Sequence, residues 1–155
     1  VLKKNISVDT REKKYFIDKY FLPNIQLGLS KKLVNFANTS IDISDGLLTD
    51  LDKLINKQKL SYKLYLDKIP ISNNLKKLIL LKRLKKKSFI SQGDDYQILF
   101  TASNSKSRII AIIAKSLGIK ISKIGKISSR AEKSQFIDQK GNKIALKYRG
   151  YYHKF

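Results

Sequence analysis

Apolar residues recur along this chain with two spacings, one typical of helices and one typical of strands. A spacing of three or four residues marks an amphipathic helix, and the break Leu22-Pro23-Asn24 separates the first such stretch from the second. Gly118 is well placed to cap the last one at its C-terminal end. We therefore predict helices over residues 15–21, 29–36, 46–57, 73–84 and 107–117.

Alternating or short apolar runs between these helices predict strands. The last two should form a hairpin around the turn at residues 138–142, and another should open from the acidic turn at residues 93–95. The predicted strands cover residues 39–44, 61–66, 96–100, 119–124, 134–137 and 143–146. Because strands alternate with helices, we expect an α/β fold, an α+β sandwich in which a mixed sheet is flanked by helices.

Length and composition are those of one folded domain. The chain has 155 residues, 42% of them hydrophobic, with 2 prolines and 7 glycines. It has no cysteine, which excludes disulfides and thiolate metal sites. No apolar run is long enough to cross a bilayer, and the first residues lack the apolar region of a signal peptide. We therefore expect a cytoplasmic protein with no membrane partner.

The net charge of +21 raises the question of a nucleic-acid partner. However, 28 of the 33 basic residues are lysines spread along the chain, whereas base readout and bidentate phosphate binding rely on arginine. The one dense basic run, residues 81–87, follows a helical pattern and suits a charged helix end. We do not expect a nucleic-acid partner, although a basic binding module remains the alternative from another functional class.

The segment from Thr39 to Asp50 carries the strongest chemical signal. As a strand it places Ile41 and Ile43 on one face and Asp42 and Ser44 on the other, with Asp45 on the following turn. These oxygen atoms suit Mg²⁺, and the N–H groups that open the next helix suit phosphate. The alternative is that Ser44 or Asp45 only caps the helix, which leaves Asp42 without an explanation.

Two other segments are ambiguous by themselves. Gly93-Asp94-Asp95 is ordinary turn chemistry and also a candidate acidic site. Tyr151 and His153 belong to a terminal aromatic cluster that could pack against a core or contact a ligand. His153 is the only histidine, so a histidine-based metal site is excluded, and no glycine-rich phosphate-binding fingerprint is present.

The order of these motifs resembles the C-terminal half of the thiamine-monophosphate kinase family, in the aminoimidazole ribonucleotide synthetase superfamily. The resemblance rests on Asp-Ile-Ser-Asp-Gly-Leu at 42–47, Gly-Asp-Asp-Tyr-Gln-Ile-Leu-Phe at 93–100, Ile-Gly at 124–125 and Gly-Tyr-Tyr-His-Lys-Phe at 150–155. It implies a single C-terminal kinase domain over residues 1–155, with a linker and entry helices at 1–37 and an α/β core at 38–155. The family's N-terminal ATP- and metal-binding domain is absent from this chain.

The resemblance also implies an activity and a set of ligands. The activity is ATP-dependent phosphorylation of thiamine monophosphate to thiamine diphosphate, with Mg²⁺. By the family pattern, Asp42 and Asp45 would bind Mg²⁺, Ser44 the ATP phosphates, Asp94 thiamine monophosphate, and Tyr151 its aromatic part. The acceptor phosphate is already anionic, so no general base is needed and no catalytic residue is assigned beyond these ligands.

The chain departs from the family pattern in three places. Asp94 replaces the usual Glu, Lys154 is inserted before the last aromatic residue, and the N-terminal domain is missing. The complete enzyme is expected to be a homodimer, and the chain alone to be inactive because it supplies only part of the metal site. The absence of methionine also suggests a fragment. A related ATP-dependent synthetase with another acceptor is the second enzyme hypothesis.

Overall fold

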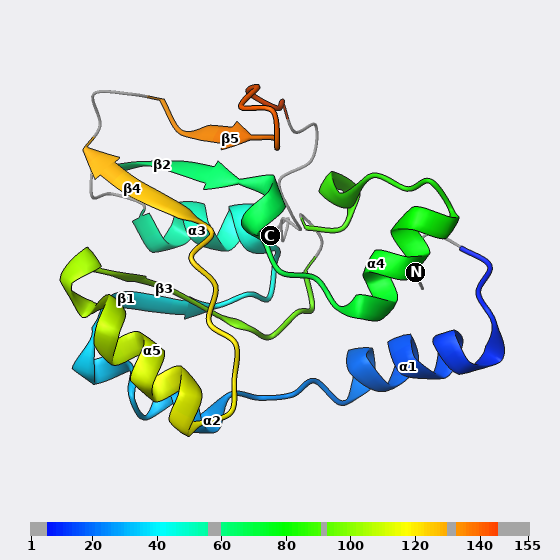
Figure 1. Cartoon of the computed structure of the whole chain (residues 1–155), viewed down its shortest axis with the longest axis horizontal. Helices are drawn as coiled ribbons and strands as arrows, with labels where there is room; N and C mark the ends of the chain where they lie inside the picture. The colour runs from blue at the N-terminus through cyan, green and yellow to red at the C-terminus, as the bar shows by residue number, and fades with distance from the viewer. Residues whose placement is uncertain (1–5, 56–59, 91–92, 130–132, 146–155) are drawn as a thin grey trace, which may run out of the picture.

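The computed structural model describes residues 6–55, 60–90, 93–129 and 133–145, and its strands form two small sheets (Figure 1). In the first sheet, β1 (Ala37–Asp42) pairs antiparallel with β3 (Ile98–Ala102). In the second, β2 (Leu60–Tyr65) lies between β4 (Gly125–Ser129), which is antiparallel to it, and β5 (Gln135–Ile137), which is parallel. An α/β fold with a mixed sheet is thus confirmed, although the strands divide between two sheets.

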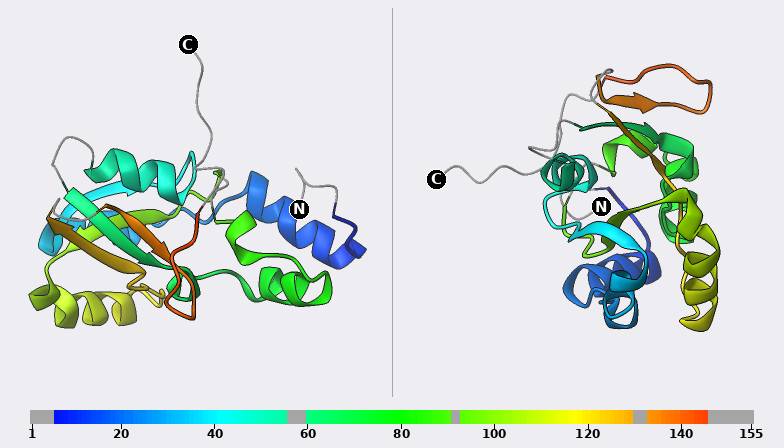
Figure 2. Two further views of the ribbon diagram at one scale, coloured as in Figure 1. Left: turned by 90° about the horizontal axis from the view of Figure 1, so that it is seen from above. Right: turned by 90° about the vertical axis from the view of Figure 1, so that its left-hand side faces the viewer.

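The helices have local capping signals that the sequence explains. Asp9 Oδ1 accepts a hydrogen bond of 2.7 Å from the Glu12 N–H, and Ser72 Oγ accepts one of 3.1 Å from the Leu75 N–H, so each caps the helix that follows it. The α-helices are α1 (Thr10–Phe21), α2 (Leu27–Ser30), α3 (Leu47–Ile55), α4 (Asn73–Leu81) and α5 (Ser107–Ser116). Short 3₁₀ turns are η2 (Leu33–Asn35), η3 (Leu66–Lys68), η4 (Lys86–Ser88) and η5 (Asn104–Lys106). Helices α1 and α4 lie at the opposite end of the molecule from α5 (Figures 1 and 2).

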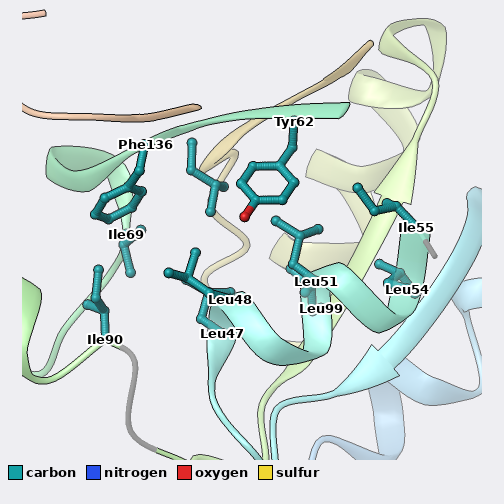
Figure 3. Close-up of a cluster of buried hydrophobic side chains, with 11 residues drawn as sticks. Leu47, Leu48, Leu51, Leu54, Ile55, Tyr62, Ile69, Ile90, Leu99 and Phe136 are labelled. Atoms are coloured by element: carbon teal, nitrogen blue, oxygen red, sulfur yellow. The ribbon is translucent and has the colours of Figure 1, made fainter. Parts of the chain in front are cut away.

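Helix α3 joins the two sheets into one core. Its apolar stripe packs against Tyr62 and Leu64 of β2, Leu99 of β3 and Phe136 of β5 (Figure 3). The stripe itself consists of Leu47, Leu48, Leu51, Leu54 and Ile55, all buried. Burying each of these side chains contributes about 1.5–3 kcal/mol, so the position of α3, and of the loop that precedes it, is firmly held.

The other face of the first sheet is covered by a second cluster. Along β3, Leu99 faces the α3 core, whereas Ile98 and Phe100 pack against this second cluster. The cluster is centred on the buried residues Leu29, Phe36 and Ile113, so α2 and α5 cover this face. Successive side chains of β3 therefore point alternately into the two clusters, as expected for a strand that is buried on both faces.

The predicted strand at residues 119–124 is wrong. Gly118 has φ +62° and the Ile119 N–H donates to the Ala114 carbonyl at 3.0 Å, which ends α5 in the predicted manner. The chain then runs without a strand until β4 begins at Gly125. Ile119 and Ile121 pack into the second cluster, so their alternation reflects burial of side chains and not pairing in a sheet.

The predicted hairpin near residue 140 is only partly formed. The turn is present, because the Asp138 N–H donates to the Asn142 carbonyl at 3.0 Å and Gly141 has φ +84°. The returning segment contributes a single bridge between Ile137 and Lys143 within the described residues. The first arm, β5, pairs instead with β2, because that register buries Phe136 and Ile137.

None of the helices in the described ranges has the length and apolar character needed to cross a membrane.

Candidate functional site

Strand β1 ends at Asp42, and a short loop carries the chain from there into α3. Asp42 is exposed and lies opposite Ile98 in the sheet register. Ile41 and Ile43 both pack against the α3 core, as their shared strand face predicted. The predicted strand extended to Ser44, and this is corrected: Ser44 lies in the loop because its N–H donates to a side chain.

That side chain is Asp50 of α3, which is completely buried. Its Oδ2 atom accepts hydrogen bonds from the N–H groups of Ser44 at 3.0 Å, Asp45 at 3.0 Å and Gly46 at 3.1 Å. Three N–H groups converging on one oxygen bind an anion strongly. The expectation that the N–H groups opening the helix receive phosphate is therefore corrected for Gly46, the first residue of the predicted helix, because a carboxylate of the chain already accepts its N–H.

Lys53, one turn further along α3, neutralises this buried carboxylate. Its Nζ donates to Asp50 Oδ1 at 2.9 Å and also pairs with Asp45 Oδ2. The hydrogen bond to Asp45, followed by that to Asp50, raises the pKa of Lys53 above its ordinary value. The side chains of Lys53, Asp45 and Asp50 are 47%, 19% and 0% exposed, so the ammonium bridges a buried and a more accessible carboxylate.

The second acidic motif lies directly against this loop. The Asp94 N–H donates to the Ser44 carbonyl at 2.8 Å, and the Tyr96 N–H donates to the Ile43 carbonyl at 2.9 Å. In return, the Ile43 N–H donates to the Gln97 carbonyl at 2.8 Å. The two motifs, about fifty residues apart in the sequence, therefore form one backbone-bonded unit at the end of β1 and β3.

The loop before β3 has an unusual backbone. Asp94 and Tyr96 have φ angles of +66° and +49°, a region that costs a non-glycine residue roughly 1–2 kcal/mol. Asp95 between them keeps an exposed surface, yet desolvation by the surrounding protein, followed by repulsion from Asp94, raises its pKa to about 6. Strain and an acid that ionises near neutral pH are both typical of functional loops.

The structure thus brings together four of the five predicted site residues at one end of the first sheet. Asp42 is exposed, while Ser44, Asp45 and Asp94 are half-buried in the two facing loops. Tyr151, like His153, lies outside the described residues. The described residues include no histidine.

Sequence reasoning missed Asp50 and Lys53, although a signal was present. Asp50 lies three residues after Leu47 and four before Leu54, so it falls on the apolar stripe of α3. A charged residue at such a position requires hydrogen-bond partners, because a buried carboxylate without them is strongly destabilising. Lys53 follows at a spacing of three and is able to reach it.

The donor set fits part of a magnesium site. Asp42, Ser44 and Asp45 provide hard oxygen atoms, which Mg²⁺ prefers. Within the described ranges, no group of three or more Asp, Glu, His or Cys side chains is arranged to hold a metal ion. Because protein-bound Mg²⁺ commonly uses one or two carboxylates together with water and substrate phosphates, the two carboxylates here suffice for one side of such a site.

The chain is similar in sequence to several known proteins. No family model matches the chain. Curated proteins named thiamine-monophosphate kinase do match it in sequence. One from Buchnera aphidicola of Acyrthosiphon pisum is 30% identical over 158 residues, and the match covers 99% of this chain and 47% of the relative. A second, from Buchnera aphidicola of Schizaphis graminum, is 34% identical over 143 residues, covering 90% and 42%.

The chain resembles thiamine-monophosphate kinases. It spans about half the length of the curated relatives that it matches, and the match is to their C-terminal part. Among solved structures, one described as AaThiL complexed with AMPPCP and TMP has a TM-score of 0.71 at 22% identity, covering 97% of this chain and 45% of the other. A thiamine-monophosphate kinase from Stenotrophomonas maltophilia has a TM-score of 0.69 at 24% identity, covering 86% and 41%. These two likenesses confirm the fold.

Proposed function

We propose that this chain forms the C-terminal part of a thiamine-monophosphate kinase, which transfers the γ-phosphoryl group of ATP to thiamine monophosphate and yields thiamine diphosphate and ADP. The similarity to named kinases over nearly the whole chain supports this activity. The AMPPCP and TMP in one solved relative support a nucleotide and TMP as ligands of this fold. We further propose a cytoplasmic, homodimeric complete enzyme.

In this proposal each site residue has a role in charge neutralisation or alignment. Asp42 and Asp45 hold Mg²⁺, Ser44 contacts the ATP phosphates, Asp94 contacts thiamine monophosphate, and Tyr151 lies against its aromatic part. When bound, Mg²⁺ supplies positive charge that offsets the charge developing on the transferred phosphoryl group. The carboxylates of this chain hold the metal and orient the acceptor. No proton has to be removed from the acceptor phosphate, because it is already anionic.

The observation that carries the proposal is the hydrogen bond between the Asp94 N–H and the Ser44 carbonyl, 2.8 Å long. It joins the loop assigned to the nucleotide with the loop assigned to the acceptor. Phosphoryl transfer requires the two substrates to be held in line, and alignment accounts for much of its catalysis. A rigid backbone connection between the two binding loops would provide this alignment.

Phosphoryl transfer to thiamine monophosphate tests the proposal. The chain is assayed alone and mixed with the N-terminal part of the Buchnera relative, with production of thiamine diphosphate as the readout. We expect turnover only in the mixture, since the chain supplies one side of the metal site. Robust turnover by the chain alone would contradict the split site.

Variants in the mixture then test the residues. Asp42→Asn, Asp45→Asn and Asp94→Asn should each lower kcat/KM by about 100-fold, because each removes a group positioned for charge or alignment. Asp18→Asn, on the exposed side of α1, is the control and should retain activity. If the three site variants retained full activity, or if another acceptor competed as the better substrate, the assignment would fail.

Binding of Mg²⁺-ATP separates the kinase from a basic nucleic-acid module. In the module, nucleic-acid binding would be tight, steeply salt-dependent and unaffected by Asp42→Ala. In the kinase, Asp42→Ala should abolish Mg²⁺-ATP binding while the circular dichroism spectrum remains unchanged.

A further inference from the structure

Lys53 places a positive charge where the proposed metal is expected. Its ammonium contacts Asp45 Oδ2, an oxygen of a proposed magnesium ligand, and lies 2.9 Å from Asp50 Oδ1. A hard dication and an ammonium compete for carboxylate oxygens and repel each other at short range. Binding of a metal through the same oxygen would therefore weaken the contact between Asp45 and Lys53.

Asp50 is not an equal competitor for the metal. Its Oδ2 is taken by the three N–H groups of residues 44–46, and its side chain is fully buried. Asp45 is 19% exposed and can be reached from solvent. A metal that arrives from solvent therefore meets Asp45 first, while Asp50 remains committed to the loop.

Lys53 can move away from Asp45. Its side chain is 47% exposed and ends a flexible four-carbon stem, so a small rotation separates Nζ from Asp45 without moving α3. Its second contact, to Asp50 Oδ1, is independent of Asp45. After leaving Asp45, the ammonium would still compensate the buried carboxylate, which avoids the cost of an uncompensated buried charge.

We propose that Lys53 is a resident cation that occupies Asp45 in the metal-free protein, and that Mg²⁺ displaces it from Asp45 while Asp50 retains it. This inference rests on the proposed function, which assigns Asp45 to the metal. Lys53 is a positioning residue that holds Asp45 toward the loop before the metal binds. It also lowers the apparent metal affinity, because the ion pair between Lys53 and Asp45 must separate before the metal can bind.

Binding of Mn²⁺ alone to the full chain tests this competition, with the electron paramagnetic resonance signal of free Mn²⁺ as the readout. Lys53→Gln should tighten Mn²⁺ binding about fivefold, the scale expected for loss of a partly exposed ion pair. Lys53→Arg keeps the charge and should bind Mn²⁺ like the parent. Lys115→Gln, which removes one exposed positive charge from α5, is the matched control and should have no effect.

The variant Asp45→Asn distinguishes failure of the metal assignment from failure of the proposed displacement of Lys53. If Asp45→Asn leaves Mn²⁺ binding unchanged, the metal assignment in the proposed function fails. If Asp45→Asn weakens binding but Lys53→Gln leaves it unchanged or weakens it, the metal assignment stands and the displacement by metal is overturned.

A measurement on the unmutated lysine covers the case in which Lys53→Gln unfolds. The side-chain ¹³Cε resonance of Lys53 is followed by NMR as Mg²⁺ is added. We expect a saturable shift in the parent chain that is lost in Asp45→Asn. A Lys53 resonance that does not move while Mg²⁺ perturbs the signals of Asp45 would overturn the inference.

Discussion

Gly93 lies so close to Ser44 that a Cβ atom built on residue 93 would be 2.0 Å from the Ser44 carbonyl oxygen. No side chain fits in that space, and the neighbouring atoms are backbone, which cannot turn aside. Gly93 therefore allows the loop carrying Asp94 to approach the loop carrying Asp45. The close backbone contact, and not a special φ angle, explains why glycine occurs here.

Replacing Gly93 by alanine should separate the two loops. We expect Gly93→Ala to lower the free energy of unfolding by about 3 kcal/mol, the upper range for overpacking, because the backbone must shift to relieve the contact. Equilibrium urea unfolding measures this loss. Gly28→Ala is the control, since its Cβ would meet only the side chain of Leu117, at 3.1 Å, and it should change stability by less than about 1 kcal/mol.

Asp50 should be the most sensitive carboxylate for stability among those described here. Asp50→Ala removes the acceptor of three N–H groups and leaves Lys53 with one carboxylate partner, so we expect a loss of about 4 kcal/mol in urea unfolding. Asp18→Ala breaks an exposed pair with Lys14 on α1 and should cost no more than about 0.5 kcal/mol. Equal losses in the two variants would show that Asp50 does not organise the loop.

The raised pKa of Asp95 makes stability depend on pH. The pKa is about 6 in the folded chain against 3.8 for the free side chain, so between these values the folded state binds the proton more tightly than the unfolded state. The stabilisation from this residue is complete below pH 3.8 and is lost as the pH rises through about 6. It is absent at higher pH.

Asp95→Asn should remove this dependence. The difference in free energy of unfolding between the parent and Asp95→Asn is measured by urea titration from pH 3.5 to pH 7.5, roughly spanning both pKa values. We expect the parent to lose stability relative to the variant as the pH rises, with most of the change between pH 3.8 and about 6. A difference that is constant across this range would contradict the raised pKa.

Lys86 should be important for the connection that follows β2. Its Nζ donates to the carbonyl oxygens of Leu66 at 2.6 Å, Asp67 at 3.3 Å and Ile69, which ties the turn η3 to η4. Lys86→Met keeps the side chain as far as its ε position but removes the ammonium that donates to these carbonyls, so we expect a loss of about 2 kcal/mol. Thermal unfolding measures it. Lys77→Met, at an exposed position on α4, should be neutral.

The sequence was sufficient wherever a signal is local. Periodicity placed α1, α3, α4 and α5, because an amphipathic helix records its buried face in its own residues. The motif at residues 42–47 and the acidic turn after Gly93 were both recognised as chemical features. Ile41 and Ile43 were predicted to share one strand face, and both pack against the α3 core. The resemblance to the kinases also required only the order of these motifs.

What the sequence could not supply is which distant groups meet. The strand predicted at 119–124 failed because alternation reports burial, and only the fold decides whether burial comes from a sheet or from a cluster around α5. The division of the strands between two sheets follows from α3 packing between them, which no single segment records.

The site shows the same division. Two carboxylates and a serine near a glycine indicated a phosphate and metal chemistry from the sequence alone. Only the tertiary structure shows that Asp50 takes the three N–H groups of the loop, that Lys53 holds Asp45, and that Gly93 lets the second loop approach. The physical reason is that residue types determine which bonds can form, whereas the folded backbone determines which partners come within bonding distance.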